Sequence, residues 1–339
     1  MGEGYNYSTI QSAVDAVPRN LAGRGEQRIV IHRKAGDPPW IYNEQVHIEG
    51  GDEGVMNASA QDFMLLTVAE EDRHKGIAGT GVALSKTTGC LLNVSLPYTR
   101  IQWLDIKGGN GDAMVECKAN GIRVENCIVH DNENVEDGGS GIEITVADVI
   151  IRNCVIYNIR GHGIIAVQSQ ASAIAQNVTV FNAGDCGIDV RDGATLSIQN
   201  CISMGSAVKD YRKWFADWTN CSNNMSSDST APGTAYIRSA SAGNQFLSLT
   251  PGNEDFHLAE NSAAINAGAL LGGFNTDIDG VLRPETENWD MGADEKKGED
   301  INQVVDRAAS AAGDTVIALK PGLYNDGKIE IKGIIEIVK

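Results

Sequence analysis

Short runs in which apolar and polar residues alternate recur between about residues 100 and 205, and Gly, Asn or Asp separate each run from the next. Alternation with a period of two residues is typical of a strand that is buried on one face, whereas Gly, Asn and Asp favour turns. Helical periodicity is missing from this region. The pattern therefore predicts consecutive short strands joined by tight turns.

Two short phrases repeat within this region. The first phrase is any residue followed by Gly-Ile, at Gly121, Gly141, Gly163 and Gly187. The second phrase is an apolar residue, any residue, Asn and then Cys or Val, with its asparagines at Asn126, Asn153, Asn177 and Asn200. Units of roughly 20 to 27 residues with two or three short strands each are typical of a solenoid whose parallel strands stack at about 4.8 Å.

Stacking the units places equivalent residues in columns. One column, which we expect to point into the solenoid, contains Cys127, Cys154, Val178 and Cys201. The four asparagines form a second column at a bend, where their amides can bond up and down the stack. Asp105 is expected to mark an earlier turn. A third column, expected to point outward, follows the Gly-Ile phrase and contains Arg123, Glu143, Ile165 and Asp189.

An open solenoid end invites edge-to-edge association, so a cap is expected at the N-terminal end. Ile10, Ala13, Val14 and Val17 follow the spacing i, i+3, i+4, i+7, which predicts a short helix with one apolar face. Ser8 or Thr9 would be its N-cap, and Pro18 helps to end it.

These phrases resemble the coil pattern of right-handed parallel β-helix proteins, the pectate-lyase-like superfamily. The segment 7–18 resembles the capping helix of pectinesterases, and the segments 255–268 and 276–295 are similar to a C-terminal signature of bacterial-surface and phage β-helix proteins. The resemblance implies an all-β fold, a right-handed single-stranded parallel β-helix with an N-terminal capping helix and a short α/β C-terminal tail. The resemblance does not fix the activity, because this fold carries many functions.

The C-terminal residues restate the opening of the chain. The segment 301–308 echoes 10–17, and the segment 320–322 echoes 34–36. We therefore predict a β-helix domain over 1–295, with the cap and first coil in 1–50, a linker over 296–300 and a cap-like tail over 301–339. About 40 residues cannot bury a core of their own. The tail is expected to pack on the main domain or to dock on another subunit, through Ile301, Val305, Ile329 and Ile331.

Charge and cysteine content exclude several functional classes. The chain has 27 basic and 45 acidic residues and a net charge of −18, so phosphate-rich partners such as nucleic acids and anionic membranes are not expected. No run of 18 apolar residues predicts a membrane span. Seven cysteines without a CxxC motif predict free thiols. The first residues lack the features of a signal peptide, although a signal that had been removed would leave the same sequence.

No complete catalytic set is evident. Gly161-His162-Gly163 matches a short motif of polygalacturonases, but the Asn-Thr-Asp, Asp-Asp and Arg-Ile-Lys motifs of those enzymes are missing. If the protein is an enzyme, Glu143, His162 and Asp189 are the candidate catalytic residues. Glu143 and Asp189 would lie about 9 to 10 Å apart, near the carboxylate separation of inverting glycosidases. A solvated polar face would produce the same pattern.

Two further groups are candidate binding sites. Asp131, Glu133 and Asp137 cluster in a long predicted turn and could offer hard oxygen ligands to Ca²⁺, but their spacing matches no calcium motif. We therefore predict no cofactor and keep Ca²⁺ as the alternative. Tyr211, Trp214, Phe215 and Trp218 follow a helical spacing. They predict either a helix or loop packed on the coils, or a partner or sugar surface formed by Tyr211, Trp214 and Trp218.

The function that these features favour is that of a non-enzymatic structural protein of a phage particle. It would be a capsid decoration or fibre protein at the virion surface, assembled with its own copies or with other virion proteins. One alternative is a polysaccharide lyase or hydrolase. The other is a carbohydrate-binding or adhesin module of a bacterial surface, which would be extracellular and would have a polysaccharide as its partner.

Overall fold

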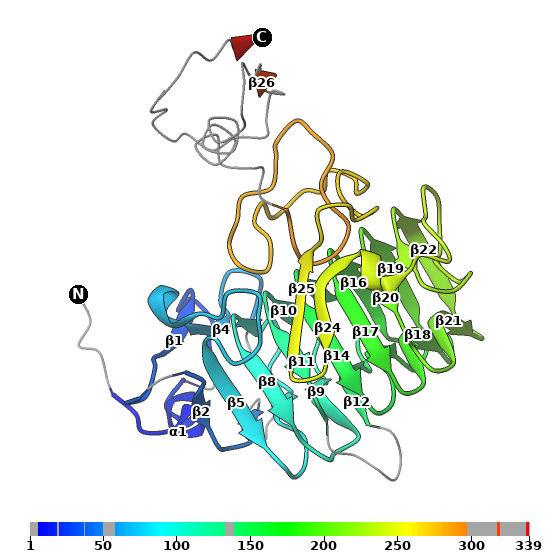
Figure 1. The fold of residues 1–339 in the computed structure, drawn as a ribbon. Helices are drawn as coiled ribbons and strands as arrows, with labels where there is room; N and C mark the ends of the chain where they lie inside the picture. The colour runs from blue at the N-terminus through cyan, green and yellow to red at the C-terminus, as the bar shows by residue number, and fades with distance from the viewer. Residues whose placement is uncertain are drawn as a thin grey trace.

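The computed structural model describes residues 6–18, 20–36, 38–49, 58–132 and 139–296, and the backbone of two short strands, β26 (Ile317–Ala318) and β27 (Ile337–Val338). Successive strands wind into a parallel β-helix in which three parallel sheets run along the solenoid (Figure 1). The prediction of stacked coils with two or three short strands each is confirmed.

Each coil contributes strands in the order sheet A, sheet B, sheet C. Sheet A contains β1 (Gln27–Ile31), β4 (Met64–Val68), β7 (Arg100–Gln102), β10 (Arg123–Glu125), β13 (Val149–Arg152), β16 (Ser172–Gln176), β19 (Thr195–Gln199) and β22 (Asp217–Ser222). Sheet B contains β2 (Trp40–Tyr42), β5 (Val82–Lys86), β8 (Asp105–Gly108), β11 (Ile128–His130), β14 (Val155–Ile159), β17 (Thr179–Ala183), β20 (Ile202–Met204) and β23 (Met225–Ser226). Sheet C contains β3 (Val46–Ile48), β6 (Leu92–Val94), β9 (Ala113–Cys117), β12 (Ser140–Ile144), β15 (Ile164–Ala166), β18 (Cys186–Arg191) and β21 (Lys209–Trp214).

The cysteine column points into the solenoid, as predicted. Cys127, Cys154, Val178 and Cys201 are fully buried and belong to the interior core, in which small apolar side chains fill the space between coils. Burial blocks access of reagents to the three thiols. Because a thiol reacts as its thiolate, Cys201 is protected further, since burial raises the pKa of its thiol to about 12.

Thiol labelling of the native protein is therefore expected to be slow at Cys127, Cys154 and Cys201, and limited by unfolding. The half-buried Cys221 provides the internal control and should react first. Rapid labelling of the three buried thiols under native conditions, measured by mass spectrometry, would contradict this packing.

The asparagine column lies at the bend between sheets A and B. Asn126, Asn153, Asn177 and Asn200 all adopt left-handed backbone conformations, with φ between 47° and 55°. In the preceding coil, the equivalent position at this bend is Trp103, with φ of 65°. The prediction that Asp105 marks this turn was therefore wrong. Asp105 instead begins β8.

The amides of this column bond mainly to the C-terminal segment rather than along the stack. Asn153 donates to the carbonyl oxygen of Thr276 at 2.6 Å, and Asn177 donates to those of Asp290 and Gly292 at 3.0 Å each. Only Asn200 follows the prediction, with a bond to Asn177 at 3.2 Å. The segment 264–293 therefore docks on the bend because the repeated amides offer it a row of donors.

A second hydrophobic core lies outside the solenoid. The outward face of sheet B presents buried Ile128, Val155 and Ile202, and the antiparallel hairpin of β24 (Phe246–Thr250) and β25 (Asn253–Leu258) packs Phe246 and Phe256 against it. Figure 1 shows this hairpin crossing β11 and β14. The hairpin and the residues that follow it therefore form an outer layer on the solenoid.

The predicted cap is confirmed. Helix α1 (Ile10–Asp15) buries Ile10 and Val14 against the first coil, and the Thr9 side chain caps it by accepting a hydrogen bond from the amide of Ser12 at 3.1 Å. Two short 3-10 helices, η1 (Glu70–Asp72) and η2 (Ala242–Asn244), complete the described elements. None of the helices within the described ranges has the length and apolar character needed to cross a membrane.

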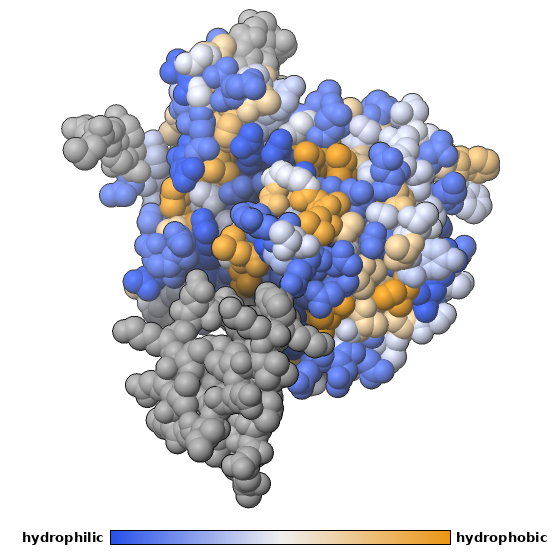
Figure 2. Space-filling model, turned by 90° about the horizontal axis from the view of Figure 1, so that it is seen from above, coloured by the Kyte–Doolittle hydropathy of each residue, from blue (hydrophilic) through white to orange (hydrophobic). Residues whose placement is uncertain are grey.

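Most of the predicted tail lies outside the described residues. Ile301, Val305, Ile329 and Ile331 and the linker residues 297–300 fall there, so the docking role of the tail and the domain boundaries stay predictions. Within the tail, β26 pairs in parallel with β27. On the face in Figure 2 the apolar patches are small and broken up by hydrophilic side chains.

Candidate functional site on the outer face of sheet C

The outward column of sheet C is a continuous row of mostly polar side chains. In register across neighbouring strands it contains Asn93, Glu116, Glu143, Ile165, Asp189 and Arg212. Glu143 and Asp189 lie two coils apart in this row, as predicted. Arg123 does not belong to the row, because it lies in β10 of sheet A and pairs with Ile150. The Gly-Ile phrase at Gly121 is therefore not equivalent to the later ones.

Asp189 is buried in an ion cluster and is not part of a solvated face. Its side chain is 0% exposed; Arg191 bonds to it through Nε, and Arg212 does so through Nη2 at 2.8 Å. Burial alone would raise the pKa of Asp189, but the bonds from Arg212 and Arg191 outweigh it and lower the pKa. Asp189 is thus ionised at neutral pH and is a poor proton donor.

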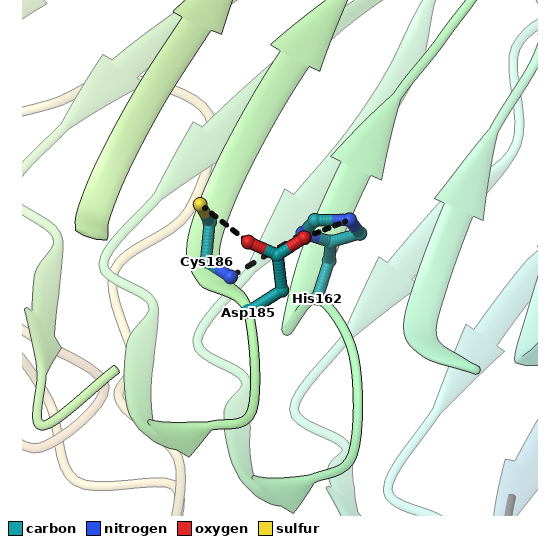
Figure 3. A group of neighbouring side chains, drawn as sticks. All are labelled: His162, Asp185 and Cys186. Atoms are coloured by element: carbon teal, nitrogen blue, oxygen red, sulfur yellow. Dashed lines mark hydrogen bonds and ion pairs between the residues drawn. The ribbon is translucent and has the colours of Figure 1, made fainter. Parts of the chain in front are cut away.

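His162, Asp185 and Cys186 complete this cluster (Figure 3). The Asp185 carboxylate lies between its two neighbours, 3.3 Å from His162 Nε2 and 3.3 Å from Cys186 Sγ. Burial lowers the pKa of His162 and raises that of the Cys186 thiol to about 12. The group has the residue types of a metal centre, but Arg191 Nη2 lies only 2.5 Å from His162 Nε2. A guanidinium thus occupies the place where a metal ion would bind.

Two exposed aromatic side chains adjoin the ion cluster. Trp214 ends β21 in register with Arg191 and is 58% exposed, and Phe215 in the following turn is 82% exposed. Their ring centroids lie 5.6 Å apart in an edge-to-face arrangement. The sequence placed Trp214 and Asp189 in separate candidate sites, whereas the fold brings them to one surface.

The other two predicted aromatic residues lie elsewhere. Tyr211 is 1% exposed and donates from its hydroxyl to the carbonyl oxygen of Cys201 at 2.9 Å, so its assignment to a partner surface was wrong. Trp218 lies in β22 of sheet A and packs against the core. The alternative of a helix or loop was also wrong, because residues 209–214 and 217–222 are strands joined by a turn at Phe215. The helical spacing of the four aromatic residues arises by chance, because they are distributed over two strands and the turn between them.

Glu116 was missed by the sequence reading. It lies directly opposite Glu143 on the neighbouring strand and accepts hydrogen bonds from Asn93 at 2.7 Å and from Lys118 at 2.5 Å. Burial, and then the carboxylates of Glu116 and Asp112, raise the pKa of Glu143. The two glutamates therefore differ in their environments: Glu116 accepts hydrogen bonds from Asn93 and Lys118, whereas Glu143 has a raised pKa. Aligning the coils by strand alternation rather than by the Gly-Ile phrase would have found this pair.

A second polar site lines a groove of about 710 Å³ between sheet B and the β24–β25 hairpin. His130 Nε2 lies 2.8 Å from Asp105 and Nδ1 lies 3.0 Å from Asp131, while the ring stacks on Tyr157. Burial alone would lower the pKa of His130, but the two carboxylates outweigh it and raise the pKa to about 9. With both nitrogens bonded, His130 is an anchor rather than a general base.

The predicted calcium ligands are described only in part. Asp131 is bonded to His130 and Asn158 and lies 3.5 Å from Lys107 Nζ. Glu133 and Asp137 lie outside the described residues, so the calcium alternative stays a prediction.

A comparison with family models supports the fold. A family model described as "Right handed beta helix region" matches residues 75–231. Among solved structures, the crystal structure of pectate lyase Pel9A is similar, with 13% sequence identity, a TM-score of 0.35 and coverage of 85% of this chain and 91% of that chain. No curated protein matches the chain. The match to this family model and the order of the strands together show that the chain folds as a right-handed parallel β-helix.

Proposed function

We propose that the protein binds a polysaccharide along the outer face of sheet C, as a carbohydrate-binding surface module. The observation that carries this proposal is the position of Trp214 and Phe215 beside the cluster of Asp185, Arg191 and Arg212. A sugar ring has apolar C–H faces and a rim of hydroxyl groups. An exposed aromatic ring suits the faces, and charged side chains held in fixed positions suit the hydroxyls.

The charges on this face favour a neutral polysaccharide over a uronate-rich one. Arg191 and Arg212 are already paired with Asp185 and Asp189, so they leave little positive charge for a ligand carboxylate. Glu116 and Glu143 extend the face with further acidic groups, and the whole chain carries −18. A polyanion would therefore be repelled during approach.

The binding test is a screen of immobilised neutral and acidic polysaccharides, followed by aromatic variants. Trp214→Ala and Phe215→Ala are each expected to weaken binding about 2- to 10-fold, which corresponds to about 0.5–1.5 kcal/mol per ring. Tyr7→Ala, which removes an exposed aromatic ring near the N-terminal cap, is the matched control and should leave affinity unchanged. Equal losses in all three variants, or none in the first two, would rule out this surface.

A second candidate function is hydrolysis of the bound glycan, favoured by the pairing of Glu116 with Glu143. Side chains opposite each other on neighbouring strands lie about 4.8 Å apart, close to the roughly 5–5.5 Å between the carboxyl groups of retaining glycosidases. Glu143, with its raised pKa, would be the acid, and Glu116, held by Lys118, the nucleophile. Release of reducing ends by the wild-type protein but not by Glu143→Gln tests this candidate.

The role in a phage particle stays a separate prediction. It depends on the resemblance of residues 255–295 to a phage-type signature and on the tail, most of which lies outside the described residues. A β-helix serves all three functional classes equally well. Finding this chain in regular copy number in purified particles would favour the particle role over a free carbohydrate-binding module.

A further inference from the structure

A second group of potential metal ligands lies in the outer layer, away from sheet C. His257 is in β25, Asp279 is in the turn after Ile278, and Asp294 lies near the end of the described chain. Each offers one ligand atom, and the three atoms lie within 4.8 Å of one another. His257 Nε2 is 3.9 Å from an Asp279 carboxylate oxygen. Three separate chain segments thus converge on one point.

The imidazole of His257 is held in an orientation suited to metal binding. Asp255 accepts a hydrogen bond from His257 Nδ1 at 2.6 Å, so the proton lies on Nδ1 and the lone pair of Nε2 faces the other ligands. Metal-binding histidines usually donate their second nitrogen to a carboxylate in this way. Gly76 leaves the Nε2 edge open, because a Cβ at that position would lie only 2.7 Å from Nε2.

Asp294 provides the second, independent observation. The residue is only 5% exposed, and its Oδ2 accepts one hydrogen bond, from the amide of Leu258 at 2.7 Å. Within the ranges that the structure describes, no group donates to its other oxygen, and no Lys or Arg forms an ion pair with it. This oxygen is not among the fully buried atoms without a partner, so it is open to a cation, which would balance the charge of the largely buried carboxylate.

We propose that His257, Asp279 and Asp294 bind a transition-metal dication, with Zn²⁺ as the reference ion. One imidazole nitrogen and two carboxylate oxygens suit Zn²⁺ better than Ca²⁺, which prefers six or more oxygens. A tetrahedral ion at about 2.0–2.1 Å places its ligand atoms about 3.4 Å apart, so the His257–Asp279 contact would shorten by about 0.5 Å. Water would fill the fourth position. The ion would clamp the hairpin, the turn and the last described residues together.

This group differs from the cluster around His162 in whether a cationic side chain lies next to the imidazole nitrogen that would bind the metal. There, Arg191 Nη2 occupies the space next to the imidazole nitrogen. Here, the charged groups within 4.0 Å of the His257 ring nitrogens are, in the described chain, the carboxylates of Asp255 and Asp279. Metal binding is therefore expected at His257 and not at His162.

The test uses the full-length chain, treated with a chelator and then titrated with Zn²⁺ by calorimetry. One equivalent is expected to bind and to raise the midpoint of thermal unfolding, because an ion bound only by the folded state stabilises it. Co²⁺ should give the visible absorption of a tetrahedral site. His257→Ala and Asp294→Asn should each weaken binding at least about 100-fold, and Asp255→Asn about 10- to 100-fold. His32→Ala, which removes a histidine beside Glu71 and Asp72, is the matched control.

Two results would overturn the proposal: no stoichiometric Zn²⁺ binding by the wild-type protein, or binding that His257→Ala and Asp294→Asn leave intact. If either of those variants fails to fold, Asp255→Asn decides the question, since Asp255 lies outside the ligand shell. An unchanged affinity and an unchanged Co²⁺ spectrum in Asp255→Asn would then count against the site.

Discussion

Replacing His130 with leucine is expected to destabilise the protein by about 3–5 kcal/mol, because removing one partner leaves the other charge buried and uncompensated. Asp105 is 2% exposed, and His130 is the only cation paired with it in the described chain. Urea unfolding measures the loss. The double variant His130→Leu/Asp105→Asn should recover part of it, since a neutral amide no longer needs a cation. A loss below about 1 kcal/mol in the single variant would contradict this account.

The same pair predicts how stability depends on pH. Because the pKa of His130 is raised from about 6.5 in the unfolded chain to about 9, its contribution is complete below pH 6.5 and is lost as the pH rises through 9. A shift of this size corresponds to roughly 3 kcal/mol. Wild-type stability should thus fall between pH 7 and pH 10 by about that much more than the stability of His130→Leu. Parallel pH profiles of the two proteins would show that His130 is not charged in the folded state.

Replacing Asn177 with alanine is expected to cost about 3–4 kcal/mol. The change removes two buried hydrogen bonds to the carbonyl oxygens of Asp290 and Gly292 and a third that Asn200 donates to Asn177, and it forces alanine into a left-handed conformation with φ of 52°. Leaving buried carbonyls unpaired costs about 1–3 kcal/mol, and the conformation about 1–2 kcal/mol. Glycine adopts the left-handed conformation without strain, so Asn177→Gly should cost only the loss of the hydrogen bonds. The difference in unfolding free energy between Asn177→Ala and Asn177→Gly, measured with denaturant, gives the conformational cost.

The matched control for Asn177 is Asn182, which has nearly the same backbone conformation, with φ of 56°, but is exposed and donates only to Asn158. Asn182→Ala should therefore cost only the conformational part, about 1–2 kcal/mol. Equal losses at the two positions would mean that the C-terminal segment contributes nothing through the asparagine column.

The sequence predicted the coils because their signal is local and repeated. The cysteine and asparagine columns follow from the spacing of Cys127, Cys154 and Cys201 and of the asparagines beside them, since stacking turns a sequence period into a spatial column. The alignment failed where a phrase occurred by coincidence. Gly121-Ile122 has the same letters as the later phrases but precedes a strand of sheet A, which hid Glu116.

The contacts that decide the candidate sites are not repeated, so no period could reveal them. The hairpin of β24 and β25 packs on sheet B through side chains that occur once, such as Phe246 and Phe256. Asp189 was placed on the outward face correctly, but its burial depends on Arg191 and Arg212, whose side chains fold back over it. Charge alone predicted solvent exposure there, and ion pairing between neighbouring coils prevents it.

Hydrogen exchange of the protein, with and without the polysaccharide that binds it most tightly, tests the central claim most directly. Binding along the outer face of sheet C is expected to protect amides in β18, in β21 and in the turn at Phe215, and to leave the groove beside His130 unchanged. Protection confined to that groove, or to any surface that excludes β18 and β21, would contradict the proposal that this face binds the glycan.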